Sequence, residues 1–191
     1  MNIQTNIEIF STFPCLESER LYFRDFSLMD SQDLFLMRSN DDVMRFMDNY
    51  KMESISDAEN FIKSINDSFN NKQGLNWVIV EKHSGNMIGY FGYWRIIHEH
   101  CRAEIGYALK PIYWNKGYMT ETIKTMIEFG FSKLKLHSIE ANVNPDNINS
   151  IKLLEKTGFR KEAHFRANYL FNGKYTDSII YSLLENDQVN I

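Results

Sequence analysis

The sequence is poor in the residues that mark secreted, metal-binding or membrane proteins. Its 191 residues include only two cysteines, Cys15 and Cys101, which are too few for a disulfide framework. His98 and His100 alternate, but no cysteine or carboxylate cluster accompanies them, so we expect no metal. No stretch reaches the roughly 18 apolar residues of a membrane span, and the N-terminus lacks the features of a signal peptide. We therefore expect a cytoplasmic protein with reduced thiols and no membrane partner.

Neither sign of charge dominates the chain or gathers in blocks. The formal net charge is −4, from 21 basic and 25 acidic residues that are interspersed along the sequence. This mild acidity offers no extended basic surface, so we expect no nucleic-acid partner, and it suits a cationic amine better. With 43% hydrophobic and 14% aromatic residues, the chain has enough apolar material for one domain with a real core.

What the sequence does contain is a strand-to-helix junction over residues 103–120. Its first part is short and apolar with a single acid, Glu104, and Pro111 cannot donate to a sheet ladder, so a strand should end there. From Thr120 onward, apolar residues recur every three or four positions, which is typical of one face of a helix. The loop between strand and helix therefore has to turn quickly, and it carries Gly117.

The start of that helix is suited to an anion. The first amides of a helix have no partner within it, and the helix dipole adds positive charge there. Gly117 lets the backbone approach a ligand closely, and Lys116 adds a flexible charge. A diphosphate would fit this place. An ordinary strand-to-helix turn without any ligand is the alternative for this window.

Two motifs in this order resemble the GNAT family of N-acetyltransferases. Residues 115–119, NKGYM after Trp114, resemble its acetyl-CoA pyrophosphate loop, where Arg or Gln is followed by two residues, Gly, one residue, and Gly or Ala. Only Gly117 matches that pattern strictly, but a Trp before the loop is common in the RimJ and RimL type, which resembles ribosomal-protein N-terminal acetyltransferases. Residues 147–159, NINSIKLLEKTGF, resemble the second motif, Asn-x-x-Ser followed eight residues later by Gly-Phe.

The resemblance implies an α/β fold with a mixed, mostly antiparallel sheet, helices on both faces, and a splayed parallel strand pair at its centre. The residues agree, because the helix between the strands at Glu104 and Ser138 favours parallel pairing. Asn172-Gly173 between two apolar runs predicts a hairpin at the C-terminal end.

The resemblance also sets the expected domain boundaries. It covers nearly the whole chain, and a single acetyltransferase domain is expected over residues 18–185. Residues 1–17 have no sustained apolar period and are expected to form an irregular leader, and residues 186–191 a tail.

Acetyl-CoA is the co-substrate that the resemblance implies. Its pantetheine arm is expected between the two diverging strands, bonded to main chain near Ala108 and Leu109. The diphosphate is expected at the main-chain N–H groups of Asn115, Lys116, Gly117, Tyr118, Met119 and Thr120. Asn147 is expected to bind CoA or to anchor its loop, and helix capping is the alternative.

Acetyl transfer to an amine needs a base, a stabiliser for the oxyanion and a proton for the departing thiolate. Glu104 is the expected base, acting through water. An ion pair with Arg102, or a polar residue at the edge of the core, is the alternative. A main-chain N–H of the Glu104 strand would hold the oxyanion. The tyrosine that many GNAT enzymes use to protonate the thiolate is replaced by Leu154, and the resemblance gives that role to Ser150. A place near a helix start explains Ser150 equally well.

The acceptor is expected to be a primary amine, either a peptide N-terminus or a small molecule such as a polyamine, amino acid or aminoglycoside. Phe46, Met47 and Tyr50 lie in the segment that forms one wall of the acceptor pocket in the resembled family. Tyr175 and Asp177 either line this pocket or brace the last hairpin, and we favour the brace. A non-catalytic acyl-CoA-binding module is a further alternative, because the glycine loop is degenerate. A monomer and a homodimer are both open.

Overall fold

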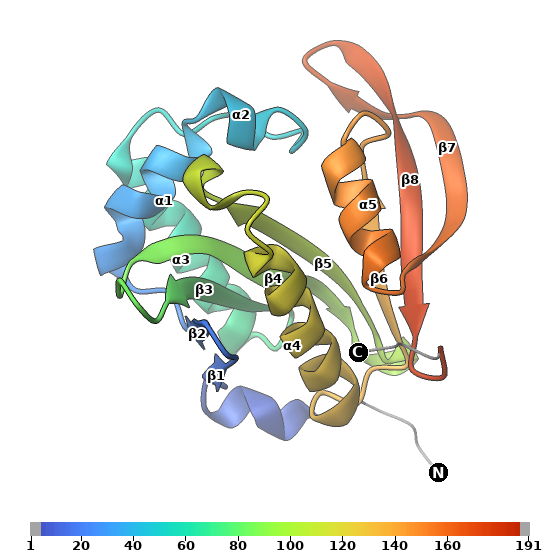
Figure 1. Cartoon of the computed structure of the whole chain (residues 1–191), viewed down its shortest axis with the longest axis horizontal. Coiled ribbons are helices and arrows are strands. Elements are labelled where there is room, and N and C mark those ends of the chain that lie inside the picture. Colours follow the sequence, from blue (N-terminus) through green and yellow to red (C-terminus); the bar gives the residue numbers. More distant parts are fainter. Residues whose placement is uncertain (1–4, 188–191) are drawn as a thin grey trace.

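A computed structural model describes residues 5–187. Within them lies one eight-stranded sheet in the order β1-β2-β3-β4-β5-β6-β8-β7, with helices in front of it and behind it (Figure 1). The strands are β1 (Leu16–Glu17), β2 (Leu21–Arg24), β3 (Leu75–Glu81), β4 (Met87–Ile97), β5 (Arg102–Leu109), β6 (Ser138–Val143), β7 (Arg160–Phe171) and β8 (Lys174–Leu184). The helices are α1 (Ser31–Arg38), α2 (Asp41–Met44), α3 (Ile55–Asn70), α4 (Tyr118–Ser132) and α5 (Ile148–Lys156), and short 3-10 turns cover Ile7–Ser11, Leu28–Asp30, His98–His100 and Pro111–Tyr113.

Two apolar clusters cover the two faces of the sheet. In front, α4 packs Ile123 and Met126 onto a cluster that includes the fully buried Trp77. Behind, α1 and α3 pack onto the other face, where the side chains of Val78 and Ala108 point. The alternation along β3 decides this division, because neighbouring residues of a strand face opposite sides. No helix among residues 5–187 is long and apolar enough to cross a membrane.

The strands expected at Glu104 and Ser138 are β5 and β6, and the expected last hairpin is the pair β7 and β8. Asn172 and Gly173 have φ of 50° and 73°, which the two-residue turn between β7 and β8 requires. A Cβ at Gly89 would lie 2.2 Å from the carbonyl oxygen of Ala108, so β4 and β5 approach too closely there for any side chain. A glycine within a strand predicts a bulge or close packing against another element, and Gly89 shows the close packing.

The parallel pair β5–β6 is short. Only Arg102, Ala103 and Glu104 of β5 pair with β6, although β5 continues to Leu109. Beyond this point β6 pairs with β8 alone. The two strands therefore part beyond Glu104, and one edge of β5 has no strand partner. The predicted fold class, including the splayed pair, is confirmed.

Two segments differ from their sequence-based description. Within the expected irregular leader, residues Ile7–Ser11 form a 3-10 helix that buries Phe10, and β1 joins the sheet, while residues 1–4 lie outside the described range. The sequence Ser-Asp-Ala-Glu at residues 56–59 predicts a capping box at the start of α3, and that prediction was wrong. Helix α3 begins earlier because Ser54 accepts the N–H of Asp57, whose carboxylate accepts the N–H of Ser54.

Candidate active site

The loop between β5 and α4 presents a row of main-chain N–H groups. Gly117 is the N-cap of α4 with φ of 81°, and Asn115 also has a positive φ of 58°. Among the described residues, the N–H groups from Asn115 to Thr120 find no protein acceptor. The stretch from Asn115 to Gly117 is exposed. Because unpaired amides at a helix start favour negative charge, this loop is a suitable anion site.

The side chains of this loop largely point elsewhere. Met119 is 8% exposed and packs into the core, and the Tyr118 hydroxyl donates to Glu81. The Lys116 ammonium lies 5.7 Å from the centre of the Tyr113 ring. Met119 therefore offers a ligand its main chain only, which is all that an amide-lined loop requires.

Contacts from distant segments hold the loop in place. Arg20, just before β2, donates from Nη1 to the Lys116 carbonyl at 3.0 Å and from Nε to Glu121 at 2.7 Å. Burial opposes ionisation of Glu121, but its hydrogen bonds with Arg20 and Ser18 hold the pKa of its carboxyl below the ordinary value. The Trp114 indole donates to the Leu109 carbonyl at 2.8 Å. The loop is thus fixed to the ends of β2 and β5.

Replacing Arg20 with methionine should weaken binding of CoA about three- to tenfold, because the loop loses its brace and Glu121 its counter-charge. Calorimetric titration with CoA measures the change. Arg160→Met is the matched control, since Arg160 pairs with Asp187 in a 71% exposed position on β7. Equal affinity in both variants would show that Arg20 does not shape the loop.

Glu104 lies where β5 and β6 part, and its carboxylate is largely enclosed. The side chain is 11% exposed and accepts a 2.6 Å hydrogen bond from Arg95 Nη2 on β4. A β-bulge at Trp94 adds one residue to β4 opposite this position and turns the strand locally. The alternative partner expected for Glu104 was wrong, because Arg102 pairs with Glu140 at 3.1 Å.

The surroundings of Glu104 make it a better base than an exposed glutamate. Burial raises the pKa of its carboxyl, the Arg95 guanidinium opposes the rise, and the neighbouring Glu140 carboxylate adds to it. The net direction is upward. A carboxylate with this shift at the point where two strands part is suited to accept a proton.

A hydroxyl pair that the sequence did not suggest joins β5 to α5. The Tyr107 hydroxyl and Ser150 Oγ lie 2.7 Å apart. The Tyr107 ring is stacked on Phe91 of β4, with 4° between the ring planes. Asn147 caps α5 by accepting the Ser150 N–H at 3.2 Å. The capping role considered for Asn147 is therefore confirmed, and its contact with CoA stays a prediction.

Comparison with known proteins decides which family has this arrangement. A family model described as an acetyltransferase (GNAT) domain matches residues 20–160. The chain belongs to the GNAT acetyltransferase family. Its GNAT homologues are named as N-acetyltransferases, and the protein is accordingly an acyltransferase with acetyl-CoA as its co-substrate.

Relatives cover the chain almost completely. The uncharacterized N-acetyltransferase YoaA of Bacillus subtilis is 36% identical over 91% of this chain and 98% of its own length. A spermidine N(1)-acetyltransferase of Vibrio cholerae is 25% identical over 91% of this chain and 98% of its own length. A GNAT acetyltransferase structure from Bacillus anthracis has a TM-score of 0.80 and 28% identity, covering 90% of this chain and 98% of that one. Mycobacterium smegmatis RimJ in complex with CoA-disulfide shares the fold, with a TM-score of 0.80 and 19% identity over 88% and 83% of the two chains.

Leu154 occupies the position where many GNAT enzymes have the tyrosine that protonates the thiolate, and this position lies in the core. Leu154 is fully buried and belongs to the apolar cluster in front of the sheet. It brings no polar group to the gap between β5 and β6. The Tyr107 and Ser150 hydroxyls are the polar side chains that reach between β5 and α5 instead.

The expected acceptor wall meets the last hairpin. The Tyr50 ring, in the segment after α2, lies 5.0 Å from the ring of Phe171 at the end of β7. Met47 of the same segment contacts the Tyr90 hydroxyl through sulfur at 3.7 Å. Asp177 accepts hydrogen bonds from His164 and from the Ala167 N–H, so it braces the hairpin, as the sequence favoured.

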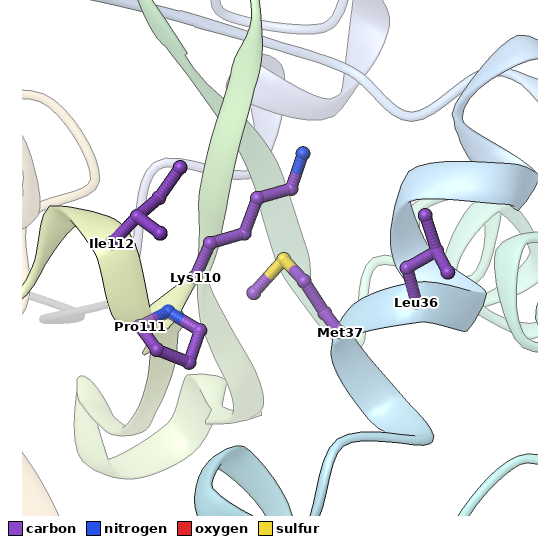
Figure 2. Close-up of a pocket in the computed structure, with 5 residues that line it drawn as sticks. All are labelled: Leu36, Met37, Lys110, Pro111 and Ile112. Atoms are coloured by element: carbon purple, nitrogen blue, oxygen red, sulfur yellow. The ribbon is translucent and has the colours of Figure 1, made fainter.

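Two hollows flank the loop between β5 and α4. One, of about 220 Å³, lies where β5 ends, and Figure 2 shows Met37 of α1 facing Lys110 and Pro111 across it. The second is lined by Arg20, Tyr118 and their neighbours. Within residues 5–187, no three metal-ligating side chains cluster. A solvated loop is what the sequence favours for His98, but its ring bonds to Thr5 and to the Lys72 carbonyl.

Proposed function

We propose that this enzyme transfers the acetyl group to the α-amine of a peptide N-terminus, in the manner of the RimJ and RimL type. One juxtaposition carries the proposed site: the free amides from Asn115 to Thr120 stand beside the β5 edge that lacks a strand partner beyond Glu104. Trp114 before the loop and the motif from Asn147 to Ser150 support the subfamily.

In this proposal the loop amides bind the diphosphate, and the pantetheine arm lies along the free edge of β5. Lys110 donates to the Ile88 carbonyl of β4, and in this register Ala108 bonds to Tyr90, so the main-chain groups of Tyr107 and Leu109 face the free edge. The Leu109 carbonyl is already bonded to Trp114, which leaves the other main-chain groups of this edge to bind the arm. Asn147 holds the turn before α5 through its cap.

The chemistry follows from the two ends of the site. The amine nitrogen forms a C–N bond with the thioester carbon and loses a proton to Glu104 through a water molecule. A main-chain N–H of β5 stabilises the oxyanion. The C–S bond then breaks, the electron pair stays on sulfur, and the Ser150 hydroxyl donates a hydrogen bond to it. Glu104 returns its proton to solvent, and the thiolate takes one up.

A polyamine is the second candidate acceptor. The spermidine N(1)-acetyltransferase relative covers 91% of this chain, whereas the RimJ likeness is one of fold at 19% identity. An acceptor of either class would reach Glu104 from the segment after α2.

Thiol release from acetyl-CoA tests the proposal across a panel of amines. The panel contains peptides beginning with Ser or Ala, spermidine, free amino acids and an aminoglycoside. We expect the peptides to give the highest kcat/KM, by about tenfold or more over the others. A higher kcat/KM with spermidine than with the peptides would identify a polyamine, and not a peptide, as the acceptor. CoA binding without turnover of any amine would overturn both candidates.

A further inference from the structure

We infer that Tyr107 is a positioning residue that orients the Ser150 hydroxyl toward the departing sulfur, an inference that rests on the proposed function. The tyrosine lies in the part of β5 that has left β6, and the serine lies in α5, the helix that follows β6. Their 2.7 Å hydrogen bond therefore reaches across the gap between the two diverging strands.

The direction of this hydrogen bond follows from the acidity of the two groups. A phenol is a stronger acid than an alkyl hydroxyl, so the tyrosine is the better donor. Burial raises the pKa of Tyr107 to about 12, so the phenol stays protonated at working pH and keeps a hydrogen to donate. Among the described residues, Ser150 Oγ has no other partner. Its own hydrogen is therefore free to be donated into the gap.

The tyrosine hydroxyl is held rigidly enough to orient the serine. The Tyr107 ring pairs with Phe91 across β4 and β5, with parallel ring planes and centres 6.4 Å apart. Stacking of this kind restricts the ring, so the hydroxyl has little freedom to leave α5. Ser150 is itself fixed by the N-terminal cap at Asn147.

The pair lies on the opposite face of β5 from the proposed base. Glu104 and Tyr107 are three residues apart, so their side chains point to opposite faces of the strand, about 10 Å apart along it. A thioester at the free edge between them would receive the amine on the Glu104 side and release sulfur on the Ser150 side. The first turn of α5 also favours a developing negative charge on that sulfur.

The test uses CoA itself and needs no acceptor. The ultraviolet absorbance of the thiolate, titrated on the CoA complex, reports the acidity of the bound thiol. In Tyr107→Phe and Ser150→Ala we expect the bound thiol to be about tenfold less acidic than in the wild type. The affinity for CoA, measured at a pH where the thiol is protonated, should change by less than about threefold.

Kinetics give a second readout. Each single variant should lower kcat about tenfold with KM for acetyl-CoA nearly unchanged, and the double variant should lose little more, because the two hydroxyls act in series. Tyr181→Phe is the matched control. It removes another buried strand-to-α5 tyrosine hydroxyl, which bonds Glu155 at 3.0 Å.

The outcomes separate this inference from the proposed function. If Tyr107→Phe and Tyr181→Phe shift thiol acidity and kcat equally, Tyr107 is only a packing residue and the inference is overturned. An unchanged thiol acidity in both Tyr107→Phe and Ser150→Ala also overturns it, while wild-type turnover of an amine would leave the proposed function standing. If the wild type turns over no amine, the proposed function and this inference are both overturned.

Discussion

Glu104→Gln should lower kcat/KM for the best amine about 100-fold or more, because it removes the proposed general base while keeping the size of the side chain. The pH profile should change as well. The wild type needs an ionised Glu104, so its activity falls as pH drops through a pKa that burial has moved upward. The variant should lose that acidic limb. Steady-state rates of thiol release over a range of pH provide the measurement.

Glu140→Gln is the matched control for this prediction. Glu140 lies beside Glu104 across the parallel pair, and its negative charge raises the pKa of Glu104. Removing that charge lowers the pKa of Glu104, so the acidic limb should move to lower pH while the activity at neutral pH remains. If Glu104→Gln kept full activity at every pH, Glu104 would be excluded as the base. If Glu140→Gln alone abolished turnover, the role would pass to Glu140.

Gly117→Val should weaken binding of CoA about tenfold or more. Gly117 has φ of 81°, a conformation that costs a residue with a side chain roughly 1–2 kcal/mol, and more for a branched one. A Cβ there would lie 3.4 Å from Arg20 Nη2, and the rest of the valine would stand over the free amides. Calorimetry with CoA measures the dissociation constant, and thermal unfolding without ligand measures the strain.

Gly173→Val separates strain from lost binding. Gly173 has a similar φ of 73° and would meet no atom within 4 Å of an added Cβ, but it lies in the turn between β7 and β8. It should lower the melting temperature to a similar extent and leave CoA affinity unchanged. Equal losses of CoA affinity in the two variants would contradict the assignment of the diphosphate site to the loop.

The strand, loop and helix that carry the site could be predicted, because each depends on local sequence signals. Pro111 ends a strand and Gly117 permits a turn wherever they occur, and β5 and α4 begin and end close to the expected residues. Asn172-Gly173 fixes a hairpin by its own backbone preference. A local sequence signal cannot place the start of a helix when two capping motifs fit equally well. Ser54 and Ser56 each precede an acid by three residues, and only packing of the helix decides between them.

The partners of the site residues could not be predicted, because they come from distant segments. Ser150 meets Tyr107, 43 residues away, and Glu121 meets Arg20, 101 residues away. The pairing of Glu104 with Arg95 depends on the bulge at Trp94, which changes the register by one residue. The sequence pointed to Ser150 and Glu104 but to neither Arg20 nor Glu121, and the fold brings the members of each pair together.

Only three residues of β5 pair with three residues of β6. This short pairing connects strands β1 to β5 of the sheet with strands β6, β8 and β7. A coenzyme bound in the gap beyond these residues would contact both strands and hold the two parts of the sheet together. A ligand that binds only the folded state stabilises that state. A higher concentration of acetyl-CoA would therefore raise the free energy of unfolding of the enzyme.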